Sequence, residues 1–423
     1  MNIERAELSR VHLLMNRIGT SALQTRLVIG VLLMLLGCNE PPSDISERLP
    51  NEEATQPAAD DGTPSEDEPE NSTLDDGVDT GDEEEIAQPP YAVGTTLLQV
   101  QYEDRELPLQ IWYPTADTGA GQPTAHFEAP GTRRDQLAAL FEDAPADCVR
   151  VSMDAIQDAE PLTGTAWPLI LFSHCHSCLR FSAFGVAEHL AANGFVVAAP
   201  DHVENTLFEE LAGNPGPLNG DFLTTRAADI RAVLDFLLSG TTGAVSELEF
   251  DESRIGMFGH SYGAVTTGRV LQDDSRVKAG VAIAAPIENP MIPGVSVATL
   301  TRPLLYLVAT EDNSITEVGN FLLRQNYDNH PAPAWKVEVT DAGHWSFSEI
   351  CGLVEMFEPG CGQATRQTNP FDEVTYIDNV LARTIARDYV LAFFQHTLLG
   401  SLDAEVFLSG PSPFPDVEVS HHQ

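Results

Sequence analysis

Residues 259–263 have the sequence GHSYG, which fits the pattern G-x-S-x-G. In that pattern a sharp turn between a strand and a helix lifts a serine hydroxyl out of a sheet. Both glycines suit a crowded turn, because a side chain at either position would meet neighbouring backbone. Residues 254–258 predict a short buried strand and residues 264–271 predict a helix. With these flanks an ordinary Gly/Ser turn is the weaker interpretation, and Ser261 is the candidate nucleophile.

A serine hydroxyl becomes a nucleophile when a base takes its proton, and an acid must hold that base in one tautomer. Where this turn occurs in α/β-hydrolase folds, the chain order is serine, acid, histidine. Asp312 ends a strongly apolar segment, and His344 lies on a glycine-containing loop after the last predicted strand. We therefore expect Asp312 to orient His344, the general base. The alternatives are Glu311 and Glu288 for the acid and His330 for the base.

Ester or amide chemistry at a serine also requires an oxyanion hole made of two N–H donors. One is expected to be the backbone amide of Tyr262, the residue after the nucleophile. The other is assigned to His176, on the loop 172–177, with Cys175 as a possible contributor. His202 follows another predicted strand; it is expected either to line the substrate pocket beside Cys175 or only to fix its own loop.

The same loop offers competing hypotheses. Its histidines and cysteines could bind a metal, or Cys175 and Cys178 could form a redox C-x-x-C pair. Both are weak, because adjacent residues on a tight loop rarely converge on one ion and no second Cys/His pair has zinc-finger spacing. A thioredoxin-type motif would also open a helix in a small domain of its own. We therefore expect no metal and no cofactor.

Strands and helices alternate from residue 91 onward. Strands are predicted at residues 96–102, 107–113, 167–172, 195–199, 254–258, 277–283, 303–308 and 335–339, and helices at 134–142, 182–193, 222–239, 264–271 and 374–399. The first two strands form an antiparallel pair. The alternation predicts an α/β fold with a mostly parallel central sheet and helices on both faces.

The first 37 residues predict a signal peptide with a basic leader. The apolar run at residues 27–36 would make a helix of ~15 Å, too short for a hydrocarbon core of ~30 Å. The sequence LLGC at residues 35–38 resembles the bacterial lipoprotein box, which implies lipidation of Cys38. A plain secretory signal or an uncleaved anchor are the alternatives. Lipidation would make the membrane a partner, and Asn39 in place of aspartate favours the outer membrane.

Residues 38–90 predict a disordered acidic linker. Between residues 40 and 85 there are eighteen aspartates and glutamates but a single base, Arg48, so the segment cannot bury enough apolar surface to fold. The whole chain carries a formal net charge of -42, which argues against a nucleic-acid partner. The catalytic domain is expected at residues 91–423.

The remaining cysteines fit an oxidising compartment. A disulfide is predicted between Cys351 and Cys361, which flank a short loop. Cys148 could pair with Cys175 or Cys178, or these last two could pair with each other. One thiol of the three is left over, and the sequence leaves the choice open.

Several segments in their chain order resemble the bacterial predicted dienelactone hydrolases, a group related to the platelet-activating-factor acetylhydrolases. They are residues 172–177, 199–206, 225–230, 254–263 and 343–347. The resemblance covers about residues 91–400 and implies an α/β-hydrolase fold and cofactor-free ester hydrolysis. The chain departs from the group at Cys175, where glycine is usual. It also has Ala284 and Ala285 where the acetylhydrolases place their acid, so Asp312 follows the more general placement.

These observations predict a serine ester hydrolase acting on short-acyl or phospholipid-type acetyl esters. One alternative is a non-catalytic surface protein that binds ligands on a hydrolase scaffold. The other is a serine peptidase or amidase that uses the same residues. The sequence leaves the oligomeric state open.

Overall fold

The computed structural model describes residues 90–119, 126–148, 152–240, 245–358 and 360–423. The expected signal peptide, Cys38 and nearly all of the acidic linker lie outside these ranges. Among the helices in the described ranges, none combines the length and the apolar character needed to cross a bilayer.

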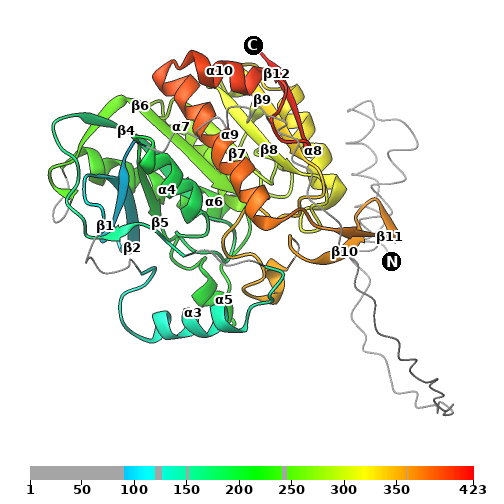
Figure 1. Ribbon diagram of the computed structural model, residues 1–423, viewed down its shortest axis with the longest axis horizontal. Coiled ribbons are helices and arrows are strands. Elements are labelled where there is room, and N and C mark those ends of the chain that lie inside the picture. The colour runs from blue at the N-terminus through cyan, green and yellow to red at the C-terminus, as the bar shows by residue number, and fades with distance from the viewer. Residues whose placement is uncertain (1–89, 120–125, 149–151, 241–244, 359) are drawn as a thin grey trace, which may run out of the picture. The chain divides into compact units, whose positions relative to one another are not determined.

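The centre of the structure is a ten-stranded sheet with the order β12-β9-β8-β7-β6-β4-β5-β2-β1-β3 (Figure 1). Neighbouring strands from β5 to β9 run parallel, whereas β1 with β2, β2 with β5 and β12 with β9 are antiparallel. The strands are β1 (Ala92–Tyr102), β2 (Arg105–Thr115), β3 (Ile156–Gln157), β4 (Ala166–Ser173), β5 (Val196–Pro200), β6 (Glu249–His260), β7 (Ala279–Ile283), β8 (Leu304–Ala309), β9 (Ala334–Val339) and β12 (Val417–His422).

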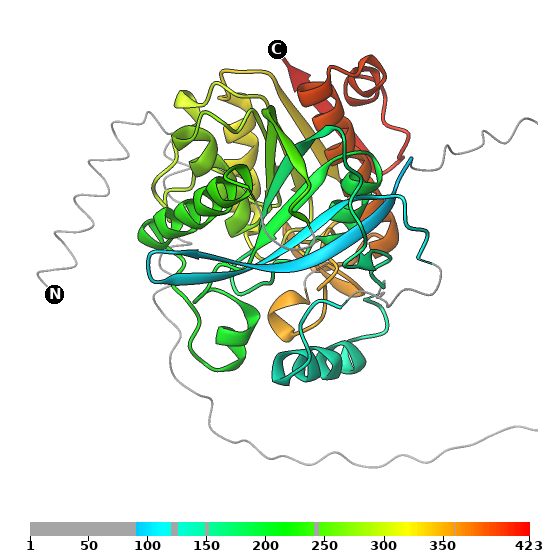
Figure 2. The same cartoon turned by 90° about the vertical axis from the view of Figure 1, so that its left-hand side faces the viewer.

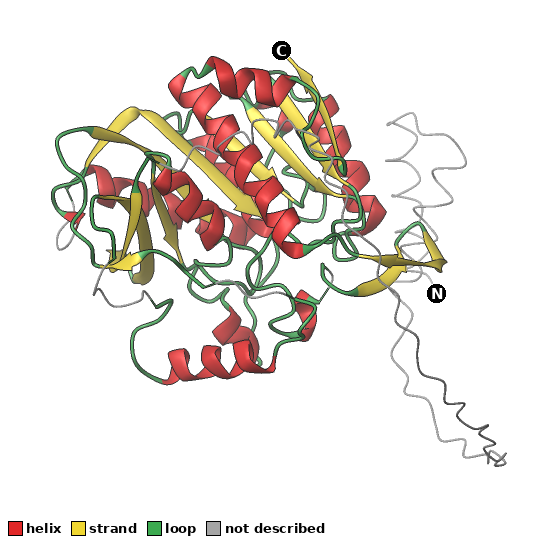
Figure 3. Cartoon of the chain, viewed as in Figure 1, coloured by secondary structure: helices red, strands yellow, loops and turns green. Residues whose placement is uncertain are grey.

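Helices cover both faces of this sheet, because alternate strand residues point to opposite sides (Figures 2 and 3). In β4, Ile170 and Phe172 join the core under α4 (Phe184–Ala192) and α9 (Asn379–Leu399). Leu169 and Leu171 join the opposite core. That second core lies under α6 (Gly220–Leu238), α7 (Tyr262–Asp273) and α8 (Thr316–Asp328). The remaining helices are α3 (Thr132–Asp143), α5 (Leu207–Leu211) and α10 (Leu402–Ser409). The predicted fold class is confirmed.

The closing helix begins later than predicted. Residue 374 lies in a two-stranded hairpin of β10 (Gln363–Arg366) and β11 (Asn369–Thr375), at the side of the molecule in Figure 1. Helix α9 begins at Asn379 because the Asp378 side chain caps it, accepting a hydrogen bond from the Leu381 amide at 2.9 Å. The sequence prediction missed this cap.

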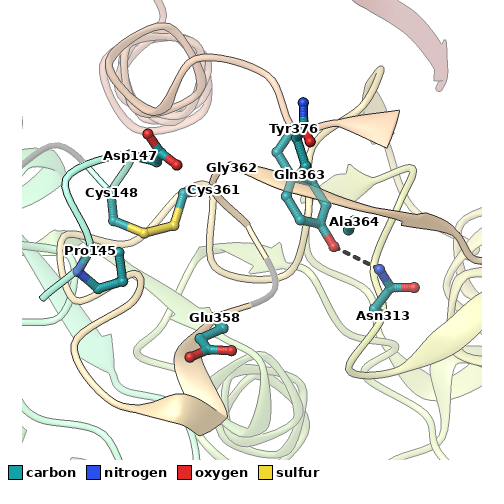
Figure 4. A pocket seen from close by; sticks show the side chains of 10 residues that line it. All are labelled: Pro145, Asp147, Cys148, Asn313, Glu358, Cys361, Gly362, Gln363, Ala364 and Tyr376. Atoms are coloured by element: carbon teal, nitrogen blue, oxygen red, sulfur yellow. Dashed lines mark hydrogen bonds between the residues drawn. A yellow bond between two sulfur atoms is a disulfide. The ribbon is translucent and has the colours of Figure 1, made fainter. Parts of the chain in front are cut away.

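The predicted Cys351–Cys361 disulfide is wrong. Cys361 is bonded to Cys148, and Cys175 is bonded to Cys178. The sulfurs of Cys148, Cys351 and Cys361 lie within 4.8 Å of one another, so the prediction chose the wrong member of one cluster. The correct partner is 213 residues away in sequence, and only the fold brings it near. Figure 4 shows this bridge beside a pocket of about 360 Å³ that Asn313 and Tyr376 also line.

Peptide mapping tests this pairing. A digest under non-reducing conditions should give one cross-linked species containing Cys148 and Cys361, and a peptide with Cys175 and Cys178 closed on each other. After reduction, the cross-linked species should separate into its two peptides, and the peptide with Cys175 and Cys178 should show the mass of its open, reduced form. The reduced digest is the internal control. A cross-link between Cys351 and Cys361 would contradict the structure.

Glu188 is a half-buried acid on the inner side of α4. Its Oε1 accepts hydrogen bonds from the backbone amides of Asp154 (2.9 Å) and Ala155 (2.8 Å). Burial raises the pKa of Glu188 to about 8, and the negative charges of Asp154 and Glu349 add to the effect, while the two amide bonds oppose it. Folding therefore favours the protonated acid.

The Glu188→Gln variant should reveal this protonation. A raised folded-state pKa contributes stability that is fully present below the ordinary value of 4.5 and is lost as pH rises through about 8. Glutamine keeps the acceptor and does not titrate. The free energy of unfolding of the wild type, minus that of the variant, should therefore fall by about 1.4 kcal/mol per pH unit inside that window. Chemical denaturation at pH 5.5 and 7.5 measures it, and parallel pH profiles for the two proteins would contradict the assignment.

Candidate active site

Ser261 occupies a strained turn between β6 and α7. Its backbone has φ 56° and ψ -120°, a conformation that non-glycine residues rarely adopt. A Cβ on Gly259 would lie 2.1 Å from the Gly263 carbonyl oxygen, and a Cβ on Gly263 would lie 1.8 Å from the Ser173 carbonyl oxygen. Both motif glycines are therefore required by contact with backbone, as the sequence predicts. The turn leaves Ser261 partly exposed while its neighbours are buried.

Asp312 and His344 are brought together at the carboxyl ends of β8 and β9. Asp312 Oδ2 accepts a hydrogen bond from His344 Nδ1 at 2.7 Å. Its other oxygen, Oδ1, accepts from the amides of Ser314 and Ile315, each at 3.0 Å. The carboxylate is fully buried and the ring is 2 % exposed. Because Nδ1 carries the hydrogen, Nε2 is the nitrogen that can accept a proton.

The other acids and the other histidine have different partners. Glu311 binds the guanidinium of Arg366 at 2.7 Å. Glu288 accepts a hydrogen bond from the amide of Val297 at 2.7 Å. His330 Nε2 bonds to the carbonyl of Arg302 at 2.9 Å. None of these side chains bonds to His344 in the described ranges, so Asp312 is the acid that the structure pairs with it.

The loop that carries His344 is held in place by contacts with His260, the residue before Ser261. His260 Nε2 donates to the His344 carbonyl at 2.8 Å, and the two rings have centroids 4.8 Å apart. Trp345 packs edge-on against the His344 ring, with centroids 5.0 Å apart, and contacts the Phe357 ring in a tilted arrangement at 4.3 Å. No hydrogen bond joins Ser261 Oγ to His344 Nε2 in the described structure. Sequence reasoning missed His260, although it is the variable residue inside the motif itself.

The two residues expected to supply the oxyanion amides contact each other through their side chains. Tyr262 is the first residue of α7, so its amide is one of the four that no carbonyl of that helix can accept. The His176 and Tyr262 rings meet edge to face at 6.2 Å. Asn205 Nδ2 donates to His176 Nδ1 at 2.7 Å. Burial, and then the nearby charge of Arg226, lower the pKa of His176, which keeps the ring a neutral acceptor.

Cys175 and His202 do not line an open pocket, which corrects that expectation. Cys175 is 1 % exposed, and its sulfur forms a disulfide with Cys178. Both cysteines belong to the loop after β4, residues 174–178, which we call the oxyanion loop for its expected role. His202 is fully buried and bonds to Ser173 and Asp229, each at 2.9 Å. Of the two interpretations of His202, the structure supports the one in which it fixes its loop.

The metal hypothesis for this loop finds no support in the geometry. His174 Nδ1 donates to the Cys175 carbonyl at 2.7 Å, and its Nε2 accepts the His202 amide at 2.9 Å. With both ring nitrogens engaged and the two cysteines in a disulfide, the side chains do not converge on a shared point.

A cleft of about 520 Å³ lies between α5 and the segment after His344. It is lined by Leu207, Glu210, Leu211, Val354, Glu355 and Met356. Residues of both walls, or next to them in sequence, contact residues near the candidate site. Glu210 accepts the hydroxyl hydrogen of Ser177, in the oxyanion loop, at 2.8 Å. On the opposite wall, Phe357 follows Met356 in sequence, and its ring packs in a tilted arrangement against Trp345, the residue after His344. In Figure 1 the two segments lie side by side below the sheet.

Comparison with known proteins finds acetylhydrolases and esterases. Residues 82–209 match the family model for platelet-activating factor acetylhydrolase, isoform II. The chain is 27% identical over 244 residues to the platelet-activating factor acetylhydrolase of Bos taurus, covering 46% of this chain and 53% of the bovine protein. It is 25% identical over 262 residues to a probable 1-alkyl-2-acetylglycerophosphocholine esterase of Arthroderma benhamiae, covering 59% and 65% of the two chains.

Among solved structures, a ferulic acid esterase from Streptomyces cinnamoneus superposes with a TM-score of 0.59 at 24% identity. The match covers 79% of this chain and 97% of the esterase, and it shows the shared fold. The chain spans about half the length of the bovine acetylhydrolase. The sheet order and the superposition show an α/β-hydrolase fold, and the sequence similarities place the platelet-activating factor acetylhydrolases among the proteins that this chain resembles.

Proposed function

We propose that this protein hydrolyses carboxylic esters through a Ser261–His344–Asp312 triad and a covalent acyl-enzyme. The observation that carries the proposal is the buried 2.7 Å bond from His344 Nδ1 to Asp312, beside a serine on a strained turn. The names of the relatives, acetylhydrolase, esterase and cutinase, favour esters over other acyl compounds.

The mechanism follows from the atoms present. Ser261 Oγ attacks the ester carbonyl while its proton passes to His344 Nε2, and Asp312 stabilises the resulting imidazolium. The amides of Tyr262 and His176 donate hydrogen bonds to the oxyanion. The tetrahedral intermediate expels the alcohol, which takes the proton from Nε2. Water then attacks the acyl-enzyme with His344 again as base, and this releases the acid and the free serine. No metal or cofactor takes part in any of these steps.

The cleft between α5 and the segment after His344 is the proposed place for the substrate beyond its ester group. Its apolar side chains suit a hydrocarbon portion, and its two charged side chains, Glu210 and Glu355, are both acidic. An ester that carries a carboxylate near the reacting bond would be repelled there. Short-acyl or phospholipid-type acetyl esters are therefore the proposed substrates, in keeping with the relatives' names.

We also propose that lipidation of Cys38 anchors the protein to the outer membrane. The support is the apolar run followed by LLGC at residues 35–38. The acidic segment after it would then serve as a tether, kept extended by its own charge repulsion.

Substitution Ser261→Ala should abolish ester hydrolysis, because it removes the attacking oxygen. We expect turnover of p-nitrophenyl acetate to fall by at least about 10³-fold, with loss of labelling by a fluorophosphonate probe. Ser253→Ala, at an exposed serine two residues after Asp251, is the matched control and should label like the wild type. Folded wild-type protein that neither labels nor turns over any ester would favour the non-catalytic binding protein.

Substitution Asp312→Asn tests the choice of acid. The asparagine cannot accept the Nδ1 hydrogen as a charged partner and favours the wrong histidine tautomer, so kcat should fall by about 10³–10⁴-fold. The neighbouring Glu311→Gln variant removes a carboxylate that binds Arg366 and should keep kcat within about threefold of the wild type. Equal losses in the two variants would contradict Asp312 as the orienting acid.

A substrate panel separates ester from amide chemistry. We expect kcat/KM to be highest for p-nitrophenyl acetate, lower for the octanoate ester, and lower by several orders of magnitude for acetyl p-nitroanilide. A matched ester that bears a free carboxylate should show a raised KM relative to its methyl-capped analogue. Faster cleavage of the anilide than of the ester would replace this proposal with a peptidase or amidase.

A further inference from the structure

A second Ser–His–Asp chain lies under the oxyanion loop. Ser173 Oγ bonds to His202 Nε2 at 2.9 Å, and His202 Nδ1 bonds to Asp229 Oδ2 at 2.9 Å. All three side chains are fully buried. No substrate can reach this serine, so its role is not a second centre of hydrolysis. The question is what the chain holds in place.

Arg226, on the inner face of α6, completes the network. Its guanidinium donates to Ser173 Oγ at 3.1 Å, to the His174 carbonyl, to Asn205 Oδ1 at 2.5 Å and to Thr266 Oγ1 at 3.1 Å. A guanidinium can only donate. Burial lowers the pKa of His202 and keeps the ring neutral, and Asp229 accepts its Nδ1 hydrogen. His202 Nε2 therefore accepts the hydrogen of the Ser173 hydroxyl, whose oxygen accepts from Arg226.

Arg226 also reaches the helix that begins at the nucleophile. Thr266 belongs to α7, and the guanidinium carbon lies 4.6 Å from the centre of the Tyr262 ring. This buried side chain thus joins α6, the oxyanion loop and the start of α7. Asp229, three residues further along α6, is held in turn by two hydrogen bonds from Arg105, at 2.8 and 3.0 Å.

The network acts on two successive peptides of the oxyanion loop. Arg226 binds the carbonyl of His174, and the His174 ring donates to the carbonyl of Cys175 at 2.7 Å. The His174 ring is itself held by the His202 amide, at 2.9 Å. A peptide is planar and trans, so an anchored carbonyl sets the direction in which its N–H points. The second of these peptides carries the amide of His176, the proposed oxyanion donor.

We propose that Arg226, with His202 and Ser173, is a positioning residue that presets the His176 amide toward the substrate carbonyl oxygen. The proposal rests on the proposed ester hydrolysis. Arg226 does not touch substrate; it acts through the Ser173–His176 backbone. Its contribution should therefore be larger for a tetrahedral oxyanion than for the bound ground state, because the preset amide matters most where negative charge develops.

The test uses the whole chain carrying Arg226→Lys. Lysine keeps a charge but cannot reach the same acceptors in a fixed fork. With p-nitrophenyl acetate we expect kcat to fall by about 10- to 100-fold, less than the ~10²–10³ for complete loss of one oxyanion donor. KM should stay within about threefold. The inhibition constant of an alkyl boronic acid, which forms a tetrahedral anion on the serine, should rise by the same factor as kcat falls.

Arg383→Lys is the matched control, since Arg383 is a buried arginine on α9 that binds the carbonyl of Asn379. It should change kcat and boronate affinity by less than about twofold. Near-ultraviolet circular dichroism and thermal unfolding establish that each variant is folded. A merely structural role would lower the unfolding temperature of Arg226→Lys without changing kcat or boronate affinity well below that temperature, and this result would overturn the proposal.

Ser173→Ala is the second variant, in case Arg226→Lys does not fold. It removes only the hydroxyl shared by His202 and Arg226, and should lower kcat and boronate affinity together by about three- to tenfold. Wild-type values for both would overturn the proposal. If the proposed ester hydrolysis is itself wrong, the wild type will neither turn over ester nor bind boronate, and the positioning role is overturned along with the activity. If only the positioning role is wrong, the wild type will be active and the variants will match it.

Discussion

The site depends on one close approach between two backbones. The Cα of Gly263 sits so near the end of β4 that a Cβ there would lie 1.8 Å from the Ser173 carbonyl oxygen. Through this contact the first turn of α7 packs against the end of β4, the strand that precedes the oxyanion loop. It also requires the strained turn at Ser261, whose cost is of the order of 1–3 kcal/mol. One steric constraint therefore places the turn at Ser261 beside the end of β4, from which the loop with His176 continues.

Much of this could be predicted from the sequence because the information is local. The strand, the G-x-S-x-G turn and the helix follow one another between residues 249 and 273. Asp312 follows the strongly apolar strand β8 and His344 follows the alternating strand β9. Parallel strands bring their carboxyl ends to one edge of the sheet. The order of the segments then favoured Asp312 and His344 over Glu311, Glu288 and His330, and the structure joins the favoured pair at 2.7 Å.

Other features depend on contacts that no short segment encodes. The partner of Cys361 is 213 residues away, so the nearer cysteine was the wrong choice. In the sequence, His202 appears as an ordinary histidine on a loop and Arg226 as an ordinary cation on a helix, so neither indicates its buried partners. The signal for Arg226 was nonetheless present, because Arg226 and Asp229 are three residues apart on the same face of α6 as Leu223 and Ile230. Charged residues inside an apolar helical stripe must find partners, since burying an unpaired charge costs several kcal/mol.

The two serine–histidine–aspartate sets show why the three residue types alone do not make an active site. In both, a carboxylate holds a histidine through Nδ1. The Ser173 oxygen, however, is fully buried and receives a hydrogen bond from Arg226, so no substrate carbonyl carbon can approach it. The strained turn leaves Ser261 partly exposed, with its hydroxyl beside the first backbone amide of α7. This difference suits Ser261 to a reaction and Ser173 to a structural role.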